Sequence, residues 1–167
     1  MLIIVCGLPG SGKSSLSKDL AKRFSAVHLN SDAIRKKLFP QPTYSEEEKV
    51  KVYEEMARQA GEILGKGNTV IADATFSKSG YRLIMADAAA RAGAKVFIIE
   101  CMLHEGETKK RLDRRQKAGK SPSDADYNVY MKLKESFEPL GGPHLEVDYL
   151  RPKKEVLAEV KEFIGEN

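Results

Sequence analysis

The chain has 167 residues, a length that predicts one domain, residues 1–167, with room for a hydrophobic core. Hydrophobic residues make up 41% and charged residues 31%, which excludes a fibrous or disordered chain, and the net charge of +4 favours anionic ligands without requiring nucleic acid. Apolar runs are too short for a signal peptide or a membrane span, so we expect a cytoplasmic protein with no membrane partner.

Short apolar runs alternate with helical patterns along the whole chain. Strands are expected at residues 2–6, 26–30, 69–73, 95–103 and 144–149. Helices are expected at residues 13–24, 33–39, 46–65 (opened by a capping box at 45–48), 78–91, 107–117, 123–137 and 154–164. Alternating strands and helices indicate right-handed crossovers and a parallel sheet covered on both faces, which is an α/β fold.

A glycine-rich stretch follows the first expected strand and precedes the first expected helix. It fits the pattern G-x-x-x-x-G-K-[ST], and its residues are Gly7, Leu8, Pro9, Gly10, Ser11, Gly12, Lys13, Ser14 and Ser15. Glycines let backbone N–H groups approach phosphate oxygens closely, and the following helix N-terminus attracts anions. We expect Lys13 to contact the β- and γ-phosphates, Ser14 to bind Mg²⁺, and Ser15 to reach the α-phosphate. The stretch therefore predicts a site for a nucleoside triphosphate, taken here as ATP.

Two polar residues follow the second expected strand. Asp32 lies at its carboxyl end, where ligands of parallel sheets collect, and Arg35 lies one helical turn further on. An aspartate beside the γ-phosphate can accept the proton of an attacking hydroxyl, and an arginine can hold an anionic group of the acceptor. The structural alternative is an aspartate that caps the helix and an arginine that is solvated.

Asp73 ends the third expected strand, and Thr75 lies on the same edge. An acidic residue at this place often holds the metal of a phosphate-loop protein, directly or through water. The alternatives are that Asp73 and Thr75 are polar groups of the acceptor site, or that Asp73 is purely structural.

A basic segment, residues 109–120, follows the fourth expected strand. Arg111 and Arg115 stack on one helical face within it, and the flexible-looking residues 118–124 come next. Arginines held over a transferring phosphoryl group stabilise its charge, so we expect a lid at about residues 109–126. A solvated basic face or a nonspecific polyanion patch is the alternative.

The cysteines and histidines give no further site. Cys6 and Cys101 each lie in an apolar run and are expected to be buried thiols, which come close only if their strands end in the same region. The three histidines show no spacing typical of metal ligands, and His28 is expected to pack within its strand. Tyr127 and Tyr130 are expected to be core residues.

These motifs resemble those of a P-loop kinase family that contains the 5′-polynucleotide kinase domain, with zeta-toxin, chloramphenicol phosphotransferase and gluconate kinase as more distant relatives. The stretches that carry the resemblance are "GLPGSGKSS", "LNSDAIRKKLF", "TVIADATF" and "KKRLDRR". The resemblance implies the three-layer sandwich of P-loop NTPases, with a five-stranded parallel sheet of order 2-3-1-4-5. It also implies that Asp32 is the general base, that Arg35 contacts an acceptor phosphate, and that Arg115 with Arg111 clamps the donor phosphates.

The expected activity is transfer of the γ-phosphoryl group of ATP, with Mg²⁺, to a hydroxyl group. By resemblance the acceptor is the 5′-OH of a nucleic acid. A kinase for a small hydroxylated metabolite or antibiotic is the first alternative, and a nucleotide-binding switch or ATPase without an acceptor is the second. The sequence gives no oligomeric state.

Overall fold

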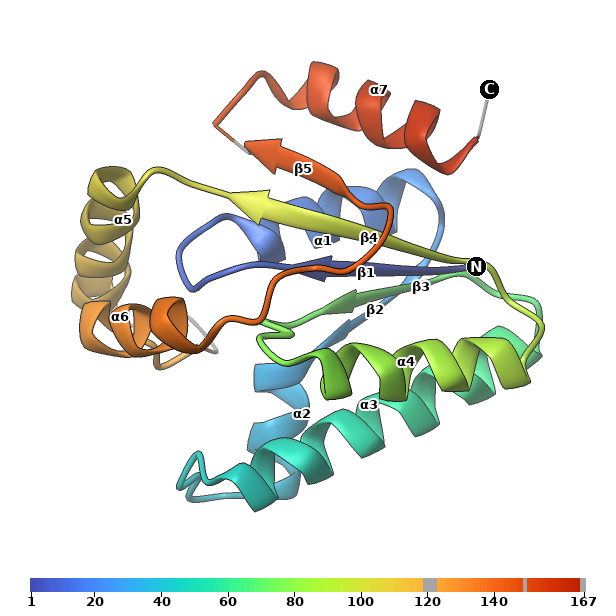
Figure 1. Ribbon diagram of the computed structural model, residues 1–167, viewed down its shortest axis with the longest axis horizontal. Helices are drawn as coiled ribbons and strands as arrows, with labels where there is room; N and C mark the ends of the chain where they lie inside the picture. The colour runs from blue at the N-terminus through green and yellow to red at the C-terminus, as the bar shows by residue number, and fades with distance from the viewer. Residues whose placement is uncertain (119–122, 149, 166–167) are drawn as a thin grey trace.

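A computed structural model of the protein describes residues 1–118, 123–148 and 150–165. Its centre is a five-stranded sheet of order β2-β3-β1-β4-β5 in which all neighbouring strands are parallel (Figure 1). The strands are β1 (Leu2–Cys6), β2 (Val27–Asn30), β3 (Val70–Asp73), β4 (Val96–Met102) and β5 (Leu145–Asp148). The expected strand order is confirmed.

The helices cover both faces of this sheet, as expected for a P-loop fold. They are α1 (Lys13–Arg23), α2 (Ser31–Leu38), α3 (Glu46–Gly65), α4 (Ser79–Arg91), α5 (Glu105–Ala118), α6 (Tyr127–Ser136) and α7 (Lys153–Ile164). In the described part of the chain, no helix is long and apolar enough to cross a membrane.

Two helix starts differ from the sequence prediction, because a side chain caps the helix at another residue. The helix expected from 123 begins at Tyr127, since the Asp126 side chain accepts a hydrogen bond from the backbone N–H of Val129 at 2.8 Å. The helix expected from 33 begins at Ser31, since the Asn30 side chain accepts one from Ala33 at 3.0 Å. Asp32 is therefore not the cap of α2 but a residue of its first turn.

The hydrophobic core lies in two layers, one on each face of the sheet. Leu2, Ile4 and Cys6 of β1 point to the layer that α3 and α4 cover, whereas Ile3 and Val5 point to the layer that α1 and α7 cover. All of β1 is buried, which explains why its sequence is continuously apolar instead of alternating.

The two cysteines lie on adjacent strands but on opposite faces of the sheet. Cys6 belongs to the α3–α4 layer and Cys101 to the α1–α7 layer. Burial raises the pKa of each thiol to about 12, so both remain protonated at neutral pH. They are buried thiols, as expected.

Helices α5 and α6 lie beyond the carboxyl ends of the strands, at the left of the sheet in Figure 1. The basic helix expected at 107–117 is longer, because it begins at Glu105 and runs to Ala118. Residues 119–122 of the expected lid lie outside the described residues. The remainder of that segment stands at the edge where ligands of parallel sheets collect.

Candidate active site

The glycine-rich loop connects β1 to α1 and requires glycine at specific positions. Gly7, Gly10 and Gly12 have φ angles of 130°, 83° and 98°. A Cβ atom on Gly7 would lie 2.4 Å from the carbonyl oxygen of Cys101, and one on Gly10 would lie 3.1 Å from Cγ2 of Thr108. The loop is thus fixed between β4 and α5, and its backbone conformation depends on the absence of side chains at these points.

Lys13 begins α1 and folds back over this loop. Its Nζ atom donates a hydrogen bond to the carbonyl oxygen of Leu8 at 2.9 Å. Burial lowers the pKa of Lys13, and the nearby carboxylates of Asp73 and Asp32 counter part of that effect. The ammonium group is therefore held at the loop and feels the charges of two acidic side chains, where it can meet an anionic ligand. Ser14 and Ser15 are exposed in the first turn of the same helix.

Asp73, at the end of β3, is almost fully buried, with an exposed fraction of 1%. It accepts a hydrogen bond from Asn30 Nδ2 at 2.7 Å, and His28 Nε2 lies 3.1 Å from the same oxygen. Burial alone would raise the pKa of Asp73, but hydrogen bonds from His28, Asn30 and Ser14 and the charge of Lys13 hold it below its ordinary value. A carboxylate that meets the Ser14 hydroxyl is a donor set that suits Mg²⁺.

His28 and Asn30 are site residues that the sequence reasoning missed. His28 was expected to pack within its strand, but its ring faces Asp73. The register of β2 against β3 places Asn30 opposite Asp73. Their spacing of two residues puts both side chains on one face of β2. This alternation is the sequence feature that could have identified them as neighbours in one site.

Asp32 is half-buried in the first turn of α2. Burial raises the pKa of its carboxyl above the ordinary value, against the opposing effects of the Lys13 charge and a hydrogen bond from Ser123. Asp32 in turn favours the charged form of Arg115, whose pKa is lowered by burial. The structure therefore brings Asp32 together with the phosphate-loop lysine and with one of the two predicted arginines.

Arg35 is buried, with an exposed fraction of 7%, so it is not a solvated side chain. Its Nη1 atom lies 3.5 Å from Oε2 of Glu48, and its guanidinium carbon lies 4.9 Å from the centre of the Tyr44 ring. Its Nε atom has no hydrogen-bond partner in the part of the chain that the structure describes. The predicted contact of Arg35 with an acceptor stays a prediction.

Glu48 differs from its expected role in a capping box. Ser45 caps α3 as predicted, by accepting a hydrogen bond from the Glu48 backbone. The Glu48 carboxylate, however, accepts hydrogen bonds from the backbone of Thr43 at 2.9 Å and of Tyr44 at 2.8 Å. It thereby connects the α2–α3 loop to Arg35 and supports Tyr44 in a left-handed conformation with φ of 58°.

The segment before α6, residues 123–126, contacts the same region from the other side. The Tyr44 hydroxyl donates a hydrogen bond to Asp124, and Lys36 Nζ lies 3.4 Å from that residue. Arg115 donates a hydrogen bond to the carbonyl oxygen of Ala125. These contacts join α2, the α2–α3 loop, α5 and the pre-α6 segment on the side of the site where Asp32 lies, and no local pattern in the sequence predicts them.

The remaining predicted residues lie at the same edge of the sheet. The carbonyl oxygen of Thr75 accepts a hydrogen bond from the Gly7 backbone at 3.3 Å, so this residue supports the phosphate loop. Arg111 lies one turn before Arg115 on α5, and Thr108 and Leu112 of that helix face Gly10. Tyr130 is buried, as predicted, whereas the prediction that Tyr127 is a core residue is wrong, because its ring is half-exposed and stacks on that of Tyr130.

Comparison with known sequences gives one domain family and several distant relatives. The profile of the AAA domain family matches residues 2–140. The uncharacterized protein Rv2004c of Mycobacterium tuberculosis is 30% identical in a region that covers 60% of this chain. The match covers only 22% of the length of that relative.

Comparison with solved structures gives similar folds over nearly the whole chain. A putative kinase from Chloroflexus aurantiacus matches with a TM-score of 0.75 at 23% identity, covering 98% of this chain and 96% of that one. The APS kinase CysC of Mycobacterium tuberculosis, solved with AMPPNP and APS, matches with 0.72 at 21% identity and the same coverage. A gluconokinase from Sinorhizobium meliloti matches with 0.69 at 21% identity, covering 98% and 90%. The expected P-loop kinase fold is confirmed.

Proposed function

Because the chain belongs to the AAA domain family and has the fold of the P-loop kinases, we propose that it transfers the γ-phosphoryl group of ATP to a hydroxyl group. The observation that carries this proposal is the position of Asp32. Its carboxyl lies outside the phosphate loop, yet close enough to Lys13 and Arg115 for their charges to act on one another. In an ATPase a carboxylate at this place would orient a water molecule instead of an acceptor hydroxyl, and the transfer assay below separates the two.

On the donor side, the phosphate loop and Lys13 bind the triphosphate. Backbone N–H groups of the loop and the N-terminus of α1 attract the phosphate oxygens, and the Lys13 ammonium adds the one full positive charge inside the loop. Ser14 and Asp73 would hold Mg²⁺, which when bound neutralises charge on the phosphates. His28 and Asn30 orient the Asp73 carboxylate.

On the acceptor side, Asp32 accepts the proton of the attacking hydroxyl. The pKa of Asp32 is raised and therefore lies closer to neutral pH than that of an ordinary aspartate. A carboxylate with a higher pKa is a better proton acceptor. Arg115 on α5 lies near enough to Asp32 to stabilise charge on the transferring group. Arg111 and Arg115 then belong to a lid formed by α5 and the pre-α6 segment, which excludes water when it closes.

We propose that the acceptor is a small hydroxylated molecule. Asp124 of the pre-α6 segment contacts Tyr44 and Lys36. These contacts bridge the acceptor side, from the pre-α6 segment to α2 and the α2–α3 loop. A small molecule fits beneath such contacts, whereas a polymer has to pass between them. The names of two similar structures, an APS kinase and a gluconokinase, agree with this choice.

The 5′-OH of a nucleic acid is the second candidate, and the surface of α5 favours it. Lys109, Lys110, Arg114 and Lys117 of this helix are all exposed. A basic helix beside the site can follow a phosphate backbone, and such binding weakens steeply as salt rises. Salt dependence therefore separates the two acceptors.

The test uses γ-labelled ATP, Mg²⁺ and the purified protein. A panel of small hydroxyl compounds is offered beside 5′-OH DNA and RNA oligonucleotides, at low and high salt. We expect label on a small compound, with little effect of salt, and no label with the Asp32→Ala variant although this variant still binds ATP. Glu47→Ala serves as the control, because Glu47 is an exposed acidic residue on α3.

Two other outcomes decide against parts of the proposal. Label on an oligonucleotide, lost at high salt, identifies a polynucleotide kinase and rejects the small acceptor. Phosphate release without any labelled acceptor, equal in the parent protein and Asp32→Ala, rejects the kinase and leaves an ATPase or switch.

A further inference from the structure

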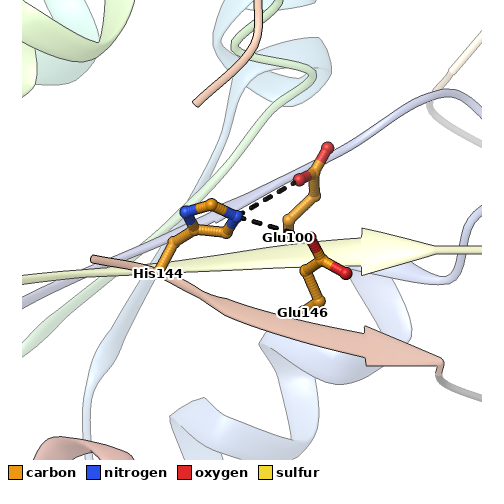
Figure 2. Close-up of side chains that lie close together, drawn as sticks. All are labelled: Glu100, His144 and Glu146. Carbon is orange, nitrogen blue, oxygen red and sulfur yellow. Dashed lines mark ion pairs between the residues drawn. The ribbon is translucent and has the colours of Figure 1, made fainter. Parts of the chain in front are cut away.

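A second group of chemically active side chains lies on β4 and β5, apart from the phosphate loop and Asp32. Glu100 of β4 and Glu146 of β5 occupy paired positions in the register of the two strands. His144 comes two residues before Glu146, so its side chain leaves the same face of the sheet. Figure 2 shows the imidazole ring directed at both carboxylates, with Nε2 at 3.9 Å from Glu100 and 3.6 Å from Glu146.

A hydrogen bond at the other ring nitrogen fixes the orientation of the His144 ring. Its Nδ1 atom lies 2.9 Å from the carbonyl oxygen of Gly142, which can only accept a hydrogen bond. Nδ1 therefore carries a proton, and in the neutral ring the lone pair of Nε2 points at the two carboxylates. A histidine whose other nitrogen donates to a backbone carbonyl is the usual arrangement of a metal ligand.

Among the described residues, no Lys or Arg side chain forms an ion pair with Glu100 or Glu146, and Lys134, which lines the neighbouring cavity, is paired with Glu105 at 2.6 Å. The Glu100 side chain is only 17% exposed. No hydrogen bond to its carboxylate is present among the residues that the structure describes, and Nε2 of His144 lies 3.9 Å from it. Two carboxylates and a nitrogen lone pair that converge within 4.8 Å create a site of negative potential.

A cavity borders this site and connects it to the back of the phosphate loop. Its volume is about 420 Å³, and its wall includes Glu100, His144, Glu146, Leu8 and Ser11. Ser11 is 3% exposed, and its hydroxyl oxygen has no hydrogen-bond partner in the described part of the chain. An unpartnered buried hydroxyl in the wall of a cavity is a polar group that a ligand or a water held there would satisfy.

We propose that Glu100, His144 and Glu146 bind a divalent cation of the Zn²⁺ class. Imidazole with carboxylate oxygens is a donor set that Zn²⁺ accepts, whereas Mg²⁺ prefers oxygen donors alone. Bonds of about 2.1 Å in a tetrahedral site place ligand atoms about 3.4 Å apart. Nε2 of His144 lies 3.6 Å and 3.9 Å from the two carboxylates, and all three ligand atoms lie within 4.8 Å of one another, so rotation of the glutamate side chains has to bring them together around the ion.

Three protein ligands leave one tetrahedral position open. The cavity provides room there for a water molecule or for an oxygen atom of a small anion. The cation would join the edge strand β5 to β4 and would bind near the back of the phosphate loop. This inference does not depend on the kinase activity, because none of its ligands belongs to the donor or acceptor side.

The test is a calorimetric titration of the full chain with ZnCl₂, without nucleotide and in a buffer that does not bind zinc. We expect one ion per chain, with the midpoint of thermal unfolding raised by zinc because only the folded protein brings the three ligands together. Both His144→Ala and Glu100→Gln are expected to weaken binding by at least about tenfold. His104→Ala is the matched control, since His104 is exposed and lies outside the group.

Two spectroscopic measurements keep the proposal falsifiable if a variant folds poorly. Zinc is expected to shift the ¹⁵N resonance of His144 Nε2 in the unmodified protein, and Co²⁺ is expected to give absorption without a sulfur charge-transfer band. A sulfur band would place the ion on Cys101 or Cys6 and overturn the proposal. So would the absence of zinc binding, equal binding by His144→Ala, or an Nε2 that keeps a proton after zinc is added.

Discussion

The donor and acceptor sides of the candidate site are built in two different ways. The donor side comes mainly from one continuous stretch, residues 7–15, and its shape is set by backbone conformation at glycines. The acceptor side comes from α2, the α2–α3 loop, α5 and the pre-α6 segment, and side chains hold it together. Tyr44 and Lys36 each reach Asp124, which is 80 and 88 residues away along the chain.

This difference separates the part of the site that would bind any nucleoside triphosphate from the part that would distinguish one acceptor from another. A backbone loop binds phosphate whatever compound is to be phosphorylated, so it can be read from a short pattern. In the proposed kinase, side chains that meet only in the folded protein would select the acceptor. Substitutions on the two sides should therefore change different quantities, namely ATP binding on one side and acceptor kinetics on the other.

The largest effect is expected on the donor side, from Lys13→Ala. The variant loses the ammonium group that the Leu8 carbonyl holds over the loop, so ATP binding and transfer should both fall. We expect a loss of transfer on the order of 10³-fold or more, as for removal of a preorganised charge in other active sites. Calorimetry with ATP and the transfer assay measure the two quantities. Transfer that survives this change would show that the loop is not the donor site.

A similar loss of rate, but with ATP binding intact, is expected from Asp32→Asn. Removing a general base costs roughly 10²- to 10⁴-fold in kcat. The parent enzyme should lose activity as the pH falls through the pKa of Asp32, because only the ionised carboxylate accepts a proton. Since burial raises that pKa, the loss should begin at a higher pH than for an ordinary aspartate. A rate profile against pH, measured for both proteins, tests this.

Asp32→Asn should show no such acid limb in its residual activity. If the limb persists in the variant, another group carries the titration, and Asp32 is then a positioning residue and not the base. If ATP affinity falls together with the rate, the division between donor and acceptor sides is wrong at this residue.

The sequence predicts the fold and the position of the glycine-rich loop, for a physical reason. Both depend on local patterns: apolar runs that become strands, and a glycine pattern that becomes a loop of positive φ angles. Even Asp73 could be placed, because it ends an apolar strand. Its partners His28 and Asn30 were missed, because the alternation along β2 does not say which residue of β3 lies opposite them, and that depends on the register of the two strands.

The acceptor side and the β4–β5 group are harder to predict for the same reason. Glu48 fits a capping box in sequence, but in the fold it has a stronger use, because Arg35 is buried within reach of its carboxylate. His144 shows no metal-like spacing along the chain, yet strand pairing brings Glu100 next to it. A local sequence pattern fails to predict the role of a charged residue where a tertiary contact provides that residue with a better partner.

A moderate effect is expected from Glu48→Gln. Glutamine keeps the size of the side chain but leaves the buried guanidinium of Arg35 without a counter-charge, so the melting temperature should fall by several degrees. The KM for the acceptor should rise while ATP affinity stays unchanged, because the α2–α3 loop loses its anchor at Thr43 and Tyr44. Thermal unfolding by circular dichroism is compared with that of Glu47→Gln, whose side chain is exposed. Equal melting temperatures for the two variants would show that the Arg35 pair does not stabilise the fold.

The smallest effect, and the most specific one, is expected from Tyr44→Phe. This change removes only the hydroxyl that donates to Asp124, and it leaves the ring that packs against Arg35. Loss of one hydrogen bond of about 1 kcal/mol should raise the KM for the acceptor roughly fivefold. Melting temperature and ATP affinity should be nearly unchanged. Tyr127→Phe is the matched control, because its hydroxyl donates to Glu105 on α5 and not across the acceptor side. An equal KM in both variants would mean that the contact between Tyr44 and Asp124 takes no part in holding the acceptor, and the lid would then have to close through Arg115 and Ala125 alone.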